Sequence, residues 1–110
     1  MDNSPEYMEQ CEKAVEIQQL EVKFRYDSHG DQYIYKKDDV WLPRQDQLQE
    51  IAGEDLSNSK TTLFYRLYDW KNKEYPRTYQ ESWEQLWLAF VMHERFGKYW
   101  DFETKEWVNE

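Results

Sequence analysis

The feature that most restricts the fold is an unbroken apolar run over residues 86–92, inside the stretch SWEQLWLAFVMHERFG. Ser82 and Gln85 have the spacing of a helix-capping box, and Gly97 can end a helix. A helix that is apolar on every side belongs in a membrane, in a protein core or in the groove of a partner. Because a bilayer needs about 20 apolar residues, the run is too short to span one. The core is favoured over the partner's groove.

This interpretation predicts how the helix near 83–96 is oriented. One set of side chains should face a sheet: Trp83, Leu86, Trp87, Phe90 and Val91. A second set should face another helix: Leu88, Ala89 and Met92. Trp87 and Phe90 are therefore expected to be buried.

Three further helices are predicted. Residues 4–20 begin with a capping Ser4 and with Pro5 at the first helical position. Their inner stripe would consist of Tyr7, Cys11, Ala14, Val15 and Gln18. Residues 43–52 form a short helix opened by Pro43 and closed by Gly53, and residues 60–72 form the third. That third helix should turn Leu63, Phe64, Leu67 and Tyr68 inward, with Trp70 as a further candidate.

Other segments have the two-residue period of strands. Val22, Phe24 and Tyr26 alternate with charged residues over 21–26, and QYIYK at 32–36 follows a DSHGD turn. KKDD predicts another turn, and VWL at 40–42 predicts a short third strand. Residues 98–108 predict a terminal hairpin, or a strand and a tail, with Trp100 and Trp107 on its apolar face. The order of elements indicates an α+β fold. We expect a single domain over 1–110, in which a small antiparallel sheet or hairpins pack with about four helices.

Composition supports a folded intracellular protein. The 110 residues include 6 Trp and 9 Tyr but only 3 Gly and 3 Pro, which excludes a low-complexity or disordered chain. The single cysteine, Cys11, cannot form an internal disulfide, and the acidic start MDNSPEYMEQCE lacks the apolar segment of a signal peptide. We therefore expect a cytoplasmic location and no membrane association.

Charge argues against binding to duplex nucleic acid. With 14 basic and 23 acidic residues, the formal net charge is −9, which repels a polyanion. The distribution is uneven, however, because residues 60–79 hold five basic and two acidic residues and so carry +3.

Three sequence blocks, YMEQCEKAVEIQ, WLPRQDQLQEI and WEQLWLAFVMHERFGKYWD, resemble a family of small proteins encoded by phages and prophages of Gram-positive bacteria. The resemblance implies an accessory protein made inside a bacterial host cell. It implies no activity, cofactor or catalytic residue.

No pattern in the sequence supports catalysis or metal binding. HERFG at 93–97 begins like a zinc-protease helix but has Gly97 where the second histidine would be needed. Cys11 lies on an apolar stripe, where cysteines are usually buried and inert. The carboxylate pairs 38–39 and 54–55 fall in predicted turns or loops. We expect no enzyme activity, no metal and no cofactor.

Two segments are candidates for binding. The first is WLPRQDQLQEI, a polar helix face with Trp41 as a partly exposed anchor; its tentative binding residues are Trp41, Arg44, Gln45, Asp46 and Gln49. The alternative is an ordinary surface helix held by its apolar residues. The second segment is the basic, aromatic stretch 60–79, with Arg66, Lys71, Lys73 and Arg77. Its rings and cations could stack single-stranded bases, or the rings could be core and the cations balance acidic neighbours.

The leading hypothesis is a non-catalytic accessory protein that binds a phage or host protein. One version is an acidic mimic of nucleic acid that inhibits a host protein. The runner-up is a factor that associates with single-stranded nucleic acid through residues 60–79.

Overall fold

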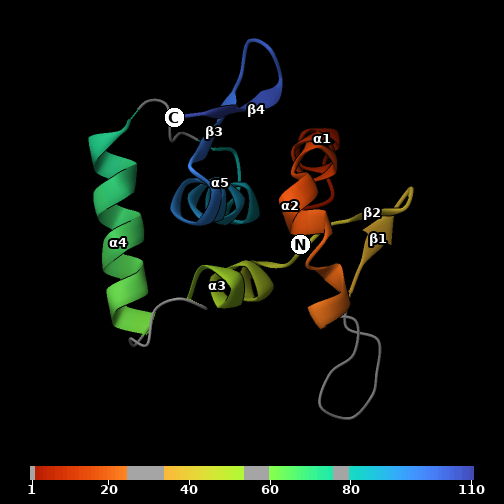
Figure 1. Cartoon of the computed structure of the whole chain (residues 1–110), viewed down its shortest axis with the longest axis horizontal. Coiled ribbons are helices and arrows are strands. Elements are labelled where there is room, and N and C mark those ends of the chain that lie inside the picture. Colours follow the sequence, from red (N-terminus) through yellow and green to blue (C-terminus); the bar gives the residue numbers. More distant parts are fainter. Residues whose placement is uncertain (1, 25–33, 54–59, 76–79) are drawn as a thin grey trace.

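Helix α5 (Trp83–Phe96) lies at the centre of the computed structural model, which describes residues 2–24, 34–53, 60–75 and 80–110 (Figure 1). The Oγ of Ser82 accepts a hydrogen bond from the backbone N–H of Gln85 at 3.2 Å, and Gly97 ends the helix with a φ of 63°. Every residue from 85 to 92 is buried, and Trp87 and Phe90 are 0% exposed. The core interpretation of the apolar run is confirmed.

Other elements surround α5 on several sides. In Figure 1, helix α4 (Lys60–Lys73) stands on one side of α5 and helix α1 (Pro5–Lys13) on the other. Helix α3 (Gln45–Gly53) lies below α5 in that view, and the hairpin of β3 (Lys98–Asp101) and β4 (Glu106–Asn109) lies above it. The prediction that this side of α5 faces a sheet is wrong for Trp87 and Phe90, whose rings pack 5.4 and 5.5 Å from those of Phe64 and Trp70 on helix α4. It is also wrong for Trp83, because its side chain is 59% exposed. It occupies the first residue of the helix, before the packed part begins at Gln85.

The predicted helix 4–20 is divided in two. Ser4 and Pro5 begin α1 as expected, with the Ser4 Oγ accepting from the N–H of Tyr7 at 3.2 Å. At Ala14 the backbone leaves the helical region, with a ψ of 71°, before the short helix α2 (Val15–Gln18). The interruption changes the direction of the side chains that follow. Tyr7 and Cys11 are buried as predicted, but Val15 is 56% exposed.

The strands form two separate antiparallel pairs. β1 (Lys36–Lys37) and β2 (Val40–Trp41) are joined by Asp38 and Asp39, whose φ values of 52° and 65° match a type I′ hairpin turn. β3 (Lys98–Asp101) pairs with β4 (Glu106–Asn109) in the predicted terminal hairpin. Trp100 lies opposite Trp107, and their rings meet edge to face at 5.1 Å.

The predicted strand over 21–26 is wrong in its described part. Glu21–Phe24 is a 3-10 helix, η1, in which Phe24 is buried and Val22 is 66% exposed. A 3-10 turn has three residues, so positions two apart do not share a face. The Phe24 ring packs 5.5 Å from that of Trp41, and this contact places the segment. Tyr26, the DSHGD turn and the EDLSNS loop lie outside the described residues.

The α+β class predicted from the order of elements is confirmed. The described residues contain five α-helices and two small two-stranded antiparallel sheets. One hydrophobic cluster joins side chains from α1, α2, β2, α3, α4 and α5. Within the described ranges, no helix has the length and apolar character that crossing a bilayer requires.

Candidate interaction surface

The WLPRQDQLQEI element does not present Trp41 to a partner. Trp41 is 0% exposed, and the side-chain amide of Gln18 holds its backbone. The Gln18 Oε1 accepts from the Trp41 N–H at 2.9 Å, and the Gln18 Nε2 donates to the Trp41 carbonyl at 2.8 Å. The Gln18 side chain thus supplies the two backbone hydrogen bonds that a neighbouring strand would form with Trp41. The prediction that Trp41 is a partly exposed anchor is therefore wrong. Its backbone groups are hydrogen-bonded within the molecule, and its ring lies in the core.

Polar groups on the outer face of this element form hydrogen bonds with one another. The Arg44 guanidinium donates to both Asp46 carboxylate oxygens, at 2.9 and 3.0 Å, and these bonds hold the pKa of Asp46 below its ordinary value. Buried Gln47 caps α3 by accepting from the Arg44 N–H at 2.9 Å. Gln45 and Gln49 are half-buried. Binding through Arg44, Gln45, Asp46 and Gln49 stays a prediction, without the exposed apolar anchor that was expected beside them.

The described residues offer no nucleophile or ligand set that is poised for chemistry. Cys11 is 0% exposed, and burial raises the pKa of its thiol, as burial also raises that of Tyr7 beside it. The Nδ1 of His93 lies 2.6 Å from the Glu110 Oε1, and its ring stacks on Trp70 at 5.3 Å. No three His, Cys, Asp or Glu side chains gather as a metal site in the described ranges. The absence of an enzyme activity stays a prediction.

Helix α4 has a narrow inner face and an aromatic outer one. Leu63, Leu67 and Trp70 are buried at helical spacing. Phe64 and Tyr68, which were expected to point inward, are 44% and 67% exposed. That expectation is wrong because residues 63, 67 and 70 already fill the contact with the core, and their neighbours are turned outward. Phe64 still rests on the core, meeting the Trp87 ring edge to face at 5.4 Å.

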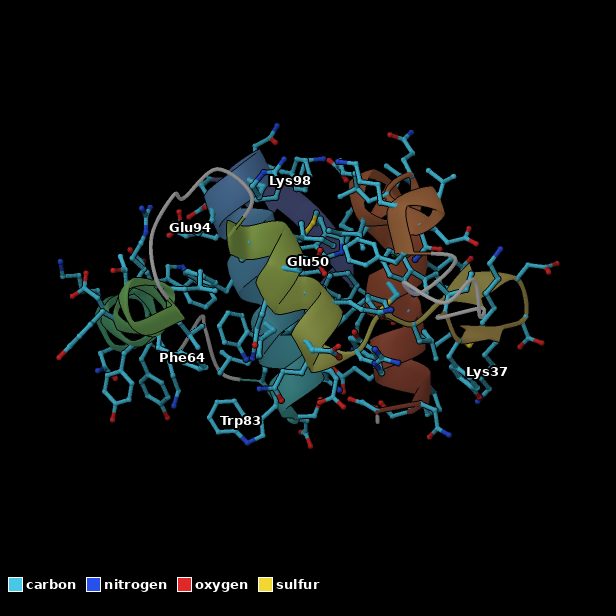
Figure 2. All side chains as sticks on the ribbon, turned by 90° about the horizontal axis from the view of Figure 1, so that it is seen from below. Lys37, Glu50, Phe64, Trp83, Glu94 and Lys98 are labelled. Atoms are coloured by element: carbon cyan, nitrogen blue, oxygen red, sulfur yellow. The ribbon has the colours of Figure 1, made fainter. Side chains whose placement is uncertain are left out.

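Five exposed rings lie on α4, in the turn after it and at the first residue of α5. We define the aromatic surface as Phe64, Tyr65, Tyr68, Tyr75 and Trp83. Tyr68 lies one helical turn from both Phe64 and Tyr65. Trp83 lies one turn before Trp87, which Phe64 contacts. Figure 2 shows Phe64 and Trp83 toward the same side of the molecule.

A groove lies between Tyr75 and Trp83, two members of this surface. Its volume is about 410 Å³. Tyr75 and Trp83 line it together with Lys71, and Leu86 belongs to the same lining. Such a groove can accept the side chain of a partner between two rings.

A separate pocket of about 660 Å³ lies where the first turns of α1 and α5 meet, and its lining includes Asp2, Ser4, Ser82 and Gln85. The groove at Tyr75 and Trp83 lies within the range of small-ligand and side-chain pockets.

The cations of the basic segment are engaged within the molecule. The Arg66 guanidinium donates to both Glu94 carboxylate oxygens, at 3.2 and 2.6 Å. Lys73 lies 3.1 Å from the Asp69 carboxylate, one helical turn away. Arg77 lies outside the described residues. Of the three cations proposed for binding that the structure describes, Lys71 alone lines the groove beside the aromatic surface.

The aromatic surface has the size of an interface. An aromatic side chain has an area of roughly 150–250 Å². With exposed fractions between 44% and 73%, its five members present on the order of 600 Å² to solvent. The largest apolar patch of a typical monomer is about 300–600 Å², and one side of a standard protein–protein interface is about 800 Å². The patch could therefore supply most of one side of such an interface.

The sequence predicted binding in this region but did not predict which of its rings are exposed. The basic, aromatic character of 60–79 was visible, whereas Trp83 was assigned to the core because it adjoins the apolar run. A usable signal was the position of Trp83 directly after the capping Ser82, where a helix has not yet entered the core. Comparisons with protein-family models, with curated proteins and with solved structures found no match.

Proposed function

We propose that the chain is a non-catalytic protein-binding protein that acts through the aromatic surface. The observation that carries this proposal is the gathering of five exposed rings on α4, the turn after it and the first residue of α5. Tyr and Trp are enriched where proteins bind one another, because they bury a large area with few rotatable bonds. The resemblance to phage and prophage proteins stays a prediction, and with it a role as an accessory protein in the cytoplasm of a bacterial host.

Two observations favour a protein partner over single-stranded nucleic acid. Arg66 and Lys73 direct their charges at Glu94 and Asp69, so they do not form a track for phosphates. The Phe64 ring packs on Trp87 and does not offer two free faces for stacking. Inhibition by mimicry of nucleic acid would use the acidic remainder of the molecule, and no described feature favours it over the aromatic surface.

The proposal is tested by affinity capture from bacterial host cells with the wild-type protein and two variants. The first variant, Tyr65→Ser/Tyr68→Ser/Trp83→Ser, removes exposed rings that do not support the core. The matched control, Val15→Ser/Val22→Ser, removes two exposed apolar side chains elsewhere, which are 56% and 66% exposed. We expect a host or phage protein to be retained by the wild type and the control and to be lost from the triple variant.

The capture should be repeated at moderate salt, where apolar contacts persist because they are not screened. Circular dichroism of all three proteins should show the same helical signal. Equal recovery of every partner by the wild type and the triple variant would contradict the proposal.

A further inference from the structure

The groove between Tyr75 and Trp83 combines two exposed rings with a carboxylate. Tyr75 is 66% exposed and Trp83 is 59% exposed, so a partner can reach both rings from solvent. Leu86, which is 6% exposed, and the exposed Glu81 belong to the same lining. Within the described residues, the Glu81 carboxylate has no ion-pair or hydrogen-bond partner. The groove therefore offers a negative charge beside two aromatic rings.

The pocket next to this groove adds further negative charge. Glu81 and Ser82 line both the groove and the pocket of about 660 Å³. The charged residues in the described lining of that pocket are all acidic: Asp2, Glu6, Glu81 and Glu84. Lys71 lines the groove and has an interaction of its own within the molecule, so the two linings together carry 1 − 4 = −3. The Lys105 ammonium, 3.9 Å from the Glu6 carboxylate, offsets one of these charges.

This combination of groups selects a cationic side chain. A guanidinium is planar, stacks on the faces of Trp and Tyr rings and can donate two parallel hydrogen bonds to one carboxylate. An acidic segment would instead meet Glu81 and the carboxylates of the neighbouring pocket. Arg66 and Lys73 would not attract it strongly, because they are paired with Glu94 and Asp69. The net charge of −9 also favours the approach of a basic segment.

We propose that the groove between Tyr75 and Trp83 binds an arginine side chain from a basic segment of the partner protein. The inference rests on the proposed function and adds the chemistry of the partner. The guanidinium would lie against the two rings, and its N–H groups would donate to the Glu81 carboxylate. Neighbouring basic residues of the segment would lie over the acidic pocket beside the groove.

Two labelled peptides serve as probes. Both have a flexible Gly-Ser chain; one carries several arginines, and its twin carries citrulline, a neutral side chain of the same shape, in their place. We expect fluorescence anisotropy at low salt to show about tenfold tighter binding of the arginine peptide, because a cation–π contact and an exposed charge pair each contribute a few-fold.

Variants of the groove locate the binding site. Trp83→Leu keeps an apolar side chain but removes the ring, and it should weaken binding of the arginine peptide about fivefold. Glu81→Gln should weaken it about threefold, and Lys71→Glu/Lys73→Glu should tighten it by a similar factor. Glu50→Gln, which removes an exposed carboxylate from α3, is the matched control and should leave the affinity unchanged.

Equal affinity for the two peptides would overturn the inference, as would an effect of Glu50→Gln as large as that of Glu81→Gln. The proposed function would survive either result if the triple variant still lost its captured protein. Tighter binding of a glutamate twin than of the arginine peptide would overturn the inference in favour of an acidic partner. Self-association in sedimentation equilibrium that Trp83→Leu abolishes would overturn it in favour of a second copy.

Discussion

At the scale of single residues, Gln18 connects parts of the chain that are distant in sequence. Its amide exchanges two hydrogen bonds with the Trp41 backbone and donates a third to the Cys11 carbonyl at 3.2 Å. Trp41 is buried, so water cannot readily replace these bonds. A buried backbone group that loses its partner costs free energy, and Gln18 satisfies two such groups at once.

Gln18→Ala should therefore lower the free energy of unfolding by about 2 kcal/mol, the cost of leaving a buried donor and acceptor unsatisfied. Urea denaturation followed by tryptophan fluorescence measures the change. Gln19→Ala is the matched control, because Gln19 is the adjacent glutamine and is exposed. If both variants unfolded at the same urea concentration as the wild type, the amide bonds would not contribute to stability.

At the scale of elements, Asp2 connects the first turns of α1 and α5. Its carboxylate accepts from the Ser4 N–H at 2.8 Å, from the Ser82 hydroxyl at 2.5 Å and from the Gln85 Nε2 at 2.9 Å. Burial raises the pKa of this carboxyl, but the hydrogen bonds outweigh burial and leave the pKa below its ordinary value of 3.8. Negative charge at the start of a helix also suits the helix dipole.

The lowered pKa sets the direction of the pH dependence. The charged form is favoured in the folded state, so the stabilisation is present above the unfolded pKa of about 3.8 and is lost as pH falls through the lower folded value. Asp2→Asn should thus destabilise the protein at pH 7 by about 1 kcal/mol, the size of one helix-cap interaction. The difference from the wild type should shrink as the pH falls below 3.8. Glu103→Gln, in the exposed turn after β3, is the control, and a pH-independent difference would contradict the assignment.

The elements differed in how far the sequence could predict them. Local signals were sufficient for α5 and for the terminal hairpin, because the cap at Ser82, the end at Gly97 and the paired tryptophans all act within a few residues. Which side chains helix α4 exposes depends on distant contacts. Phe64 and Tyr68 have the same apolar character as Leu63 and Leu67, and only the packing of α4 on the core separates the exposed pair from the buried pair.

At the scale of the whole molecule, the arrangement of charge decides which large partners can approach. Positive charge gathers on α4, whereas the remaining residues are strongly acidic. The Debye length is about 8 Å at physiological salt, so a partner close to α4 experiences mainly the local charge. A short protein segment that enters the groove meets Glu81 as well as Lys71. A rigid duplex extends beyond the range of α4 and meets the acidic remainder.

Duplex DNA should consequently show no measurable binding near physiological salt. Affinity for DNA arises largely from counterions that basic side chains release from phosphates, and Arg66 and Lys73 are already paired with Glu94 and Asp69. Fluorescence anisotropy with a labelled duplex of about 20 base pairs, titrated at low and at physiological salt, measures this directly; that length spans roughly two helical turns. The Lys71→Glu/Lys73→Glu variant is the control for any weak signal at low salt. Micromolar binding of the wild type that persists at physiological salt would show that the local charge of α4 outweighs the net charge of −9.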